Sequence, residues 1–213
     1  MAIWAITGGI ASGKSTVANV FEQQHVRRYS ADDDARDVMN LPTVQAAIEE
    51  KFPSCFTKEH TVIRDRLADC IYKSPELRLV LGEIMHPHIR QRMRSVIDLA
   101  QINSTALHIY EVPLLFEGNL QTWFDGVVCV VCDLQTQRDR IRMRQQNRYG
   151  RSISDTEIDQ MLASQMDIQE KIAQAQIVIN MSRLTEEETV AAVRTAIKAM
   201  HKQMLESHEL GQT

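Results

Sequence analysis

The sequence GGIASGKST at residues 8–16 decides how the rest of the chain is interpreted, because it follows the pattern G-x-x-x-x-G-K-[ST]. The apolar run AIWAI at residues 2–6 precedes it and predicts a buried strand. Residues 17–21 (VANVF) follow it with apolar side chains at helical spacing. A strand, a glycine-rich turn and a helix in this order indicate a phosphate-binding loop, or P-loop. The alternative, a glycine-rich turn that binds nothing, fits these two flanks less well.

The residue types in this loop suit the phosphates of a nucleotide. Glycine tolerates positive φ and carries no side chain, so backbone N–H groups can turn inward and approach crowded oxygens. A helix that starts near Lys14 adds its positive end. We expect Lys14 to bridge the β- and γ-phosphates of ATP, the Ser15 hydroxyl to ligate Mg²⁺ and Thr16 to reach the α-phosphate side. The residues expected to bind the nucleotide are Gly8, Gly9, Ile10, Ala11, Ser12, Gly13, Lys14, Ser15 and Thr16.

The composition is that of an ordinary globular protein. Of 213 residues, 44% are hydrophobic and 24% charged, and the net charge is −4, which gives no prior for binding nucleic acid or an anionic membrane. No stretch approaches the length of a transmembrane helix, and the first apolar run is too short for a signal peptide. We therefore expect a cytoplasmic protein that contacts neither nucleic acid nor membrane. We also expect a small-molecule substrate and a monomer or weak homo-oligomer, neither of which follows from composition.

The cysteines include one C-x-x-C pair, Cys129 and Cys132, inside the apolar run VVCVVC at residues 127–132. On a strand, residues three apart face opposite sides. No second pair of Cys or His stands nearby to complete a zinc site. We predict that these thiols pack as small hydrophobic groups and form no metal or redox site.

Five short apolar runs predict the strands of one sheet. One of them is apolar almost throughout, as a central parallel strand should be. Helical periodicity separates the runs. This alternation predicts an α/β fold of the P-loop NTPase type, with a parallel sheet of about five strands flanked by helices. The expected strands are residues 2–6, 25–30, 106–112, 127–133 and 176–180.

Residues 34–100 carry helical patterns and no strand, which is more helix than one crossover between strands needs. We therefore predict one P-loop domain, residues 1–213, with a helical substrate subdomain and a helical lid. Pro87 should end or kink the helix around it. The expected helices are 34–40, 43–51, 62–73, 76–99, 154–174 and 185–206. The nucleotide-binding core is expected at 1–33, 101–137 and 175–213, the substrate subdomain at 34–100 and the lid at 138–174.

Carboxylates follow two of the predicted strands. Asp32 opens the run DDDAR, and Glu111 lies near the end of the third strand. The carboxyl ends of parallel strands form the edge at which ligands bind in open α/β sheets. An acid there can orient or deprotonate an acceptor hydroxyl, or hold Mg²⁺ through water. A solvated acidic helix N-terminus explains Asp32 equally well. Glu117 is expected to be a surface or helix-cap carboxylate.

The strongest charge cluster lies at residues 138–151. A helix rich in arginine suits a lid that places cations over the γ-phosphate and excludes water as it closes. A basic solvated helix or a nucleic-acid patch is the alternative, and the acidic net charge and the absence of interleaved aromatic residues disfavour nucleic acid. The arginines are Arg138, Arg140, Arg142, Arg144, Arg148 and Arg151.

The predicted helical subdomain carries the motif HPHI at residues 86–89. Taken alone, His86 is more typical of a helix end or a packing contact than of catalysis. Arg90, Arg92 and Arg94 follow and could face an anionic substrate. A solvated face is the better explanation for at least two of them.

Several of these motifs occur in the same order in one family. The chain resembles the dephospho-coenzyme A kinases, which carry the loop T-G-G-I-G-S-G-K-S-T, then D-A-D-x-x-A-R, H-P-x-I and V-P-L-L-x-E, and a glutamine in the lid. The resemblance covers nearly the whole chain. The matching residues are Thr7–Thr16, Ala31-Asp32 with Ala35-Arg36, His86-Pro87 with Ile89, Val112–Leu115 with Glu117, and Gln165.

The resemblance implies ATP-dependent phosphorylation of the ribose 3′-hydroxyl of dephospho-coenzyme A, the final step of coenzyme A biosynthesis, with Mg²⁺. It implies that Asp32 is the base at the acceptor hydroxyl and that Lys14 stabilises the transferring phosphoryl group. Arg142 best matches the lid arginine, with Arg148 as second choice. The region around His86 would hold the coenzyme A portion. The residues expected to contact the acceptor are Asp32, Arg36, His86, Pro87, Glu111, Pro113 and Leu114.

Three positions depart from the family pattern. Ala11 stands where glycine is usual, and Ser30 replaces the first Asp of D-A-D. Met181 occupies the place where an Asn near the adenine is common, and Asn180 is a substitute after a shift of one residue. These departures concern affinity and rate more than the type of reaction, because Lys14 and Asp32 remain.

Two other functions stay open from sequence. Another small-molecule P-loop kinase, such as a nucleoside monophosphate kinase, would share the fold, the lid and Lys14. A non-catalytic nucleotide-dependent switch is the second alternative. A GTPase switch should carry an N-K-x-D guanine motif after a late strand, and the sequence has none.

Overall fold

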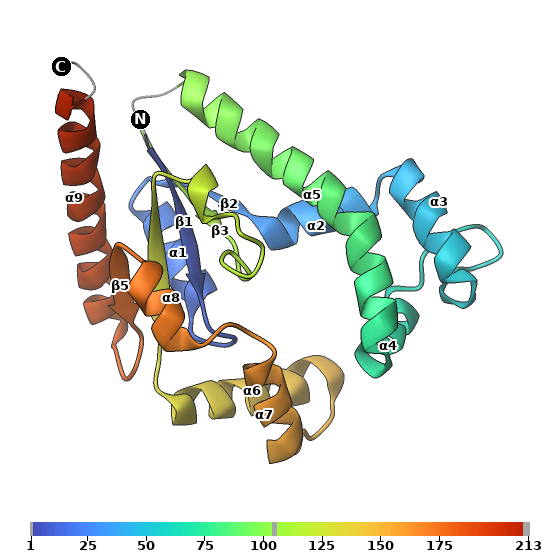
Figure 1. Ribbon diagram of the computed structural model, residues 1–213. Coiled ribbons are helices and arrows are strands. Elements are labelled where there is room, and N and C mark those ends of the chain that lie inside the picture. The colour runs from blue at the N-terminus through green and yellow to red at the C-terminus, as the bar shows by residue number, and fades with distance from the viewer. Residues whose placement is uncertain (1, 104–105, 211–213) are drawn as a thin grey trace. The chain divides into compact units, whose positions relative to one another are not determined.

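The computed structural model describes residues 2–103 and 106–210, with their side chains except at residues 73, 101–103, 148–149 and 207–210. The chain forms two compact units (Figure 1). The sheet unit comprises the residues up to Ser30 and those from Ala100 onward, and the helical unit spans Ala31–Leu99. No helix in the described part is both long and apolar enough to cross a lipid bilayer.

The sheet unit is built on five parallel strands in the spatial order β2-β3-β1-β4-β5. β1 lies at the centre and all its residues are buried, which explains why its sequence is continuously apolar instead of alternating. The predicted five-stranded parallel sheet is confirmed. The strands are β1 Ala2–Gly8, β2 Arg27–Ser30, β3 Leu107–Glu111, β4 Gly126–Val131 and β5 Ile177–Asn180.

One face of the sheet packs against α1 and α9 (Figure 1). Trp4 and Ile6 of β1 share a buried cluster with Phe21 of α1 and with Val193 and Met200 of α9. This packing fixes the strand and the helix that flank the glycine loop. The helices of the sheet unit are α1 Lys14–Gln23, α6 Leu134–Tyr149, α7 Asp155–Ala163, α8 Ile168–Gln174 and α9 Glu186–Leu210, with a 3₁₀ turn at Gln121–Trp123.

The stretch 154–174, expected to be one helix, forms two. Ser154 starts α7 with a capping box, in which its side chain and that of Glu157 bond each other's backbone N–H groups. Asp167 starts α8, since its carboxylate accepts a hydrogen bond from the backbone N–H of Gln169 at 2.7 Å. This second cap places Gln165 and Met166 in a turn between helices.

The helical unit starts with α2 directly after β2, three residues before the expected bound of 34. Its core consists of apolar residues from all four helices, among them Val38, Val44, Leu67 and Met85. The helices are α2 Ala31–Met39, α3 Pro42–Lys51, α4 Arg64–Lys73 and α5 Pro75–Asn103, with a 3₁₀ turn at Pro53–Cys55. The last four residues of α5 belong to the sheet unit.

α5 carries Pro87 and the three arginines that follow it. The helix continues through Pro87, so of the two effects expected of this proline the end of the helix does not occur; the proline removes one backbone donor. Arg92 joins α5 to α2, because its Nε lies 2.8 Å from a carboxylate oxygen of Asp34 and its guanidinium also contacts Asp37. Arg92 is thus an internal brace of the helical unit.

Candidate active site

The loop between β1 and α1 is folded around its own lysine. Lys14 is buried, and its Nζ donates to the carbonyl oxygens of Gly9 at 2.7 Å and Gly8 at 3.2 Å. The N–H of Ser12 closes a turn onto the Gly9 carbonyl at 3.2 Å. A buried ammonium group needs such partners because the loss of its hydration is costly. The arrangement fixes one positive charge against the backbone carbonyls of the loop.

Backbone conformation explains which loop residues are glycines. Gly8 and Gly13 have φ of 147° and 101°, and a Cβ on Gly8 would lie 2.0 Å from the carbonyl oxygen of Val130. Ala11 adopts φ 56°, a left-handed conformation that costs a non-glycine residue about 1 kcal/mol. The departure from glycine at Ala11 therefore keeps the loop geometry at the cost of local strain.

One polar atom of the loop has no protein partner. The Ser12 hydroxyl oxygen is buried and makes no hydrogen bond within the described residues. Buried hydroxyl groups are normally satisfied. A donor directed into a loop of backbone amides next to Lys14 fits an anionic group such as a phosphate.

Ser15, the first residue after Lys14, contacts Glu111 at the end of β3. Its hydroxyl donates to Glu111 Oε1 at 2.7 Å, and the other oxygen of Glu111 pairs with Arg28 at 2.9 Å. Arg28 also donates to Asn19 of α1 at 2.5 Å. Mg²⁺ prefers hard oxygen ligands and commonly uses one or two protein groups together with substrate phosphates. The Ser15 hydroxyl and the Glu111 carboxylate fit that requirement, although the described residues contain no cluster of three or more His, Cys, Asp or Glu suited to a metal.

The helix that carries the arginines touches the loop through one of them. Arg140 of α6 donates to the carbonyl oxygens of Ser12 at 3.1 Å and Ala11 at 3.3 Å. Two glutamines contact the adjacent Ile10: Gln137 donates to its carbonyl at 2.8 Å, and Gln165 accepts from its N–H at 2.8 Å. Neither Gln137 nor the particular role of Arg140 could be recognised from the sequence, because helical spacing alone does not show which side chains reach another segment.

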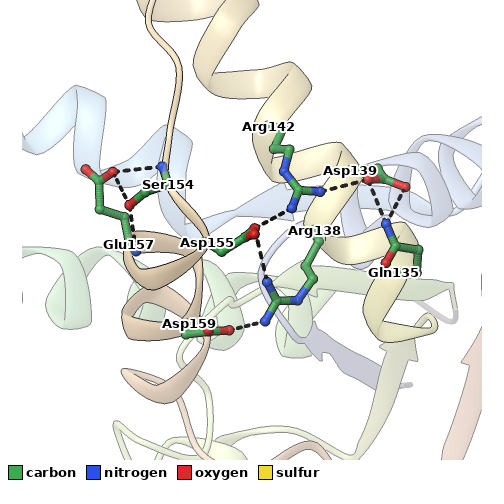
Figure 2. A network of polar contacts seen from close by, with 8 residues as sticks. All are labelled: Gln135, Arg138, Asp139, Arg142, Ser154, Asp155, Glu157 and Asp159. Carbon is green, nitrogen blue, oxygen red and sulfur yellow. Dashed lines mark hydrogen bonds and ion pairs between the residues drawn. The ribbon is translucent and has the colours of Figure 1, made fainter.

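Arg142, which was expected at the γ-phosphate, contacts acidic side chains of α6 and α7. Figure 2 shows Arg142 between Asp139 and Asp155, 3.0 Å from Asp139, and Arg138 between Asp155 and Asp159. These pairs join α6 to the start of α7. The Arg142 side chain is 39% exposed, so solvent can reach it. The role predicted for Arg142 stays a prediction, and the side chain of Arg148 lies outside the described residues.

We expected Glu117 to be a surface or helix-cap carboxylate, but it is neither. It is half-buried, accepts a hydrogen bond from the Met166 N–H at 3.0 Å and pairs with Lys171 at 2.7 Å. Lys171 of α8 is fully buried. Burial alone would raise the pKa of Glu117, but the Lys171 ammonium and the N–H donor hold that pKa below its usual value. No pattern in the sequence marks Lys171 as the partner.

The residues expected to contact the acceptor fall into both units. Asp32, Arg36, His86 and Pro87 are exposed on the helical unit, and Arg36 pairs with Asp33 at 2.5 Å. In the sheet unit Glu111 is buried, the Pro113 carbonyl accepts from the Thr7 hydroxyl at 3.3 Å, and Leu114 is 50% exposed. Their roles toward a substrate stay predictions.

Two further expectations concern β4 and β5. Cys129 of β4 is buried and its pKa is raised to about 11 by burial, as expected of a packed thiol, whereas Cys132 follows the strand and is half-buried. Met181 is buried close to Gly13. The Asn180 side chain accepts from the Ser182 N–H at 2.9 Å, so it is already used in the turn after β5.

The fold and the loop define the class of protein: a P-loop kinase. A protein of Thermus thermophilus has the same fold, with a TM-score of 0.74 and 25% identity over 93% of this chain and 97% of that chain. The dephospho-CoA kinase of Campylobacter jejuni also shares it, with a TM-score of 0.69 and 22% identity over 94% of this chain and 97% of that chain.

The family follows from the sequence comparisons. A family model for dephospho-CoA kinase matches residues 2–187. The dephospho-CoA kinase of Bdellovibrio bacteriovorus is 35% identical over 180 residues, which are 84% of this chain and 86% of the relative. The chain therefore belongs to the dephospho-CoA kinase family and is an ATP-dependent kinase.

The Glu117–Lys171 pair gives a stability prediction. Lys171→Met should lower the free energy of unfolding by about 3 kcal/mol at pH 7, because it leaves a half-buried carboxylate without its counter-ion. The double variant Glu117→Gln/Lys171→Met should recover most of this loss. Urea unfolding measures both, and Lys198→Met on the exposed face of α9 is the control.

The same pair should depend on pH in one direction. Because the pKa of Glu117 is lowered by folding, its contribution is present above about pH 4.5 and is lost as the pH falls through the folded value. The deficit of Lys171→Met should therefore shrink below about pH 4.5. Equal stability of the single and double variants at pH 7 would contradict this role of the pair.

Proposed function

We propose that this protein transfers the γ-phosphoryl group of ATP to the ribose 3′-hydroxyl of dephospho-coenzyme A, giving coenzyme A and ADP. The observation that carries the proposal is the buried Lys14, held by the Gly8 and Gly9 carbonyls of the loop. Family membership supports the choice of acceptor. We further propose that it works in the cytoplasm, as a monomer or weak homo-oligomer.

The roles follow from the chemistry of phosphoryl transfer. The acceptor oxygen attacks the γ-phosphorus as its proton passes to the Asp32 carboxylate, and the bond from the γ-phosphorus to the β,γ-bridging oxygen breaks as ADP leaves. Lys14 balances charge on the β- and γ-phosphate oxygens, where it acts in a site that excludes water. The exposed position of Asp32 in the first turn of α2 leaves its carboxylate accessible to a substrate.

The Ser15 hydroxyl and the Glu111 carboxylate, which contact each other, would hold Mg²⁺. When bound, it would neutralise negative charge on the β- and γ-phosphates. Arg28 holds Glu111 oriented toward Ser15, since one carboxylate oxygen contacts each of them. The protein's part is thus to keep a hydroxyl and a carboxylate together at the start of α1.

Among the lid arginines, the geometry favours Arg140 over Arg142 as the cation nearest the phosphates. Arg140 bonds carbonyls of the loop itself. Arg142 is engaged by Asp139 and Asp155, and it would have to leave both to reach a nucleotide. Among the described side chains, Arg140 therefore contacts the loop, whereas Arg138 and Arg142 join α6 to α7.

The reaction is tested by incubating the protein with ATP and Mg²⁺, with and without dephospho-coenzyme A, and measuring ADP release and product mass. We expect ADP release to require the acceptor and the acceptor to gain one phosphate. In the same assay Asp32→Asn should lose at least about hundredfold in kcat with ATP affinity nearly unchanged, and Asp33→Asn is its matched control. Phosphorylation of a nucleoside monophosphate instead, or ADP release indifferent to the acceptor, would overturn the proposal.

The division among the arginines is tested by Arg140→Met and Arg142→Met. Arg140→Met should lower kcat by about hundredfold, as removal of one transition-state donor does, with little change in the melting temperature. Arg142→Met should lower kcat less than about tenfold and lower the melting temperature, because Asp139 and Asp155 each lose one of their partners. The opposite pattern would return the catalytic role to Arg142.

A further inference from the structure

Both peptide groups of one loop residue are held by glutamine side chains. The Ile10 N–H donates to Gln165 Oε1 at 2.8 Å, and the Ile10 carbonyl accepts from Gln137 Nε2 at 2.8 Å. Gln137 comes from α6 and Gln165 from the turn between α7 and α8. We call these two residues the glutamine clamp.

The Gln137 side chain lies directly against the backbone of Gly9. A Cβ on Gly9 would lie 2.6 Å from Nε2 of Gln137, so Gly9 must lack a side chain for Gln137 to reach Ile10. Ala11, directly after the clamped residue, has φ 56°. A strained left-handed residue persists only where its neighbours fix the chain. The clamp supplies this restraint, because Gln137 binds the carbonyl of the peptide that joins Ile10 to Ala11.

The turn that carries Gln165 is itself anchored. The next residue, Met166, donates its N–H to Glu117 at 3.0 Å, and Glu117 is paired with the fully buried Lys171 at 2.7 Å. The backbone at Met166 is therefore tied to the segment after β3, while the neighbouring Gln165 side chain reaches the loop. A buried ion pair is sensitive to geometry, which makes it a suitable anchor for a short turn.

We propose that Gln137 and Gln165 are positioning residues, which hold the Ile10 peptides so that the loop amides after Ile10 face the phosphates, and that the Glu117–Lys171 pair sets Gln165. Neither glutamine has to touch the nucleotide. The proposal rests on the proposed function only in that the phosphates are those of ATP.

The first test needs no substrate. In Gln165→Met, the Ile10 amide should exchange with solvent about tenfold faster than in the wild-type protein, as measured by hydrogen-exchange NMR, while amides of β1 and α9 keep their protection. Gln169→Met, on the exposed side of α8, is the matched control and should leave Ile10 unchanged. An unchanged Ile10 exchange rate in Gln165→Met would overturn the proposal.

The second test uses binding of a non-hydrolysable ATP analogue with Mg²⁺. Gln165→Met and Gln137→Met should each raise its Kd by about five- to tenfold, with the melting temperature within about 2 °C of wild type and the KM for the acceptor unchanged. An unchanged Kd, or a higher Kd accompanied by a large fall in melting temperature, would overturn the positioning role. Because neither readout involves transfer, failure here is distinguishable from failure of the proposed function.

An independent observation in the helical unit concerns two thiols. The sulfurs of Cys55 and Cys70 lie 3.5 Å apart. Cys55 ends the 3₁₀ turn and is buried in the core of the unit, whereas Cys70 of α4 is partly exposed. Two thiols in contact need only a small rotation about their side-chain bonds to reach disulfide geometry.

We infer that Cys55 and Cys70 form a site of reversible oxidation by peroxide. The more accessible Cys70 thiol takes one oxygen from hydrogen peroxide to become a sulfenic acid, with release of water. Cys55 sulfur then attacks the Cys70 sulfur, and the hydroxyl leaves as a second water, which gives the disulfide. The cross-link joins the 3₁₀ turn to α4, and a thiol reductant reverses it.

The test is treatment of the full chain with hydrogen peroxide, followed by peptide mass analysis without reduction. We expect a cross-linked peptide pair containing Cys55 and Cys70, a loss of two hydrogens in mass, and a higher melting temperature that reductant reverses. Cys70→Ser should abolish the cross-link, and Cys132→Ser, the other half-buried thiol, should not. Four free thiols after treatment, or a cross-link between other cysteines, would overturn the inference.

Discussion

The structure depends on keeping one ammonium group, Lys14 Nζ, inside a loop of backbone. The carbonyls of Gly8 and Gly9 hold it, and a buried cation without such partners would be strongly destabilising. This requirement explains the conformation around it: β1 ends in a glycine whose approach to Val130 leaves no room for a side chain, and α1 starts at the lysine itself. The loop cannot relax without leaving a charge unsolvated.

Parallel strand order brings the other groups to this loop. β1 lies between β3 and β4, so the carboxyl ends of all three strands meet beside it. Glu111 comes from the end of β3, and α6, which carries Gln137 and Arg140, follows β4. Residues separated by 96 to 128 positions in the sequence thus contact the loop and the start of α1. The site is a consequence of topology, and α6 and the turn before α8 contact it through the side chains of Gln137, Arg140 and Gln165.

The local parts of this arrangement could be predicted from sequence. The loop, its flanking strand and helix, and the parallel sheet follow from glycine spacing and apolar periodicity. The Glu117–Lys171 pair, the contacts of Arg140 and the split at Asp167 could not, because each depends on which side chains tertiary packing brings together or on a single cap. The arginine cluster shows the limit clearly: spacing suggested Arg142, whereas Arg140 contacts the loop. The roles of Asp32 and His86 toward the acceptor stay predictions, because the residues expected to contact the acceptor fall into both units.

The central claim is that Lys14 stabilises the transferring phosphoryl group. The most direct measurement is the single-turnover rate of phosphoryl transfer from ATP to dephospho-coenzyme A by Lys14→Met, with Lys198→Met as the control. The account predicts a rate lower by at least about hundredfold, together with far-ultraviolet circular dichroism like that of the wild-type protein. Transfer at a rate close to wild type would contradict it, because the buried ammonium group would then have no part in the reaction.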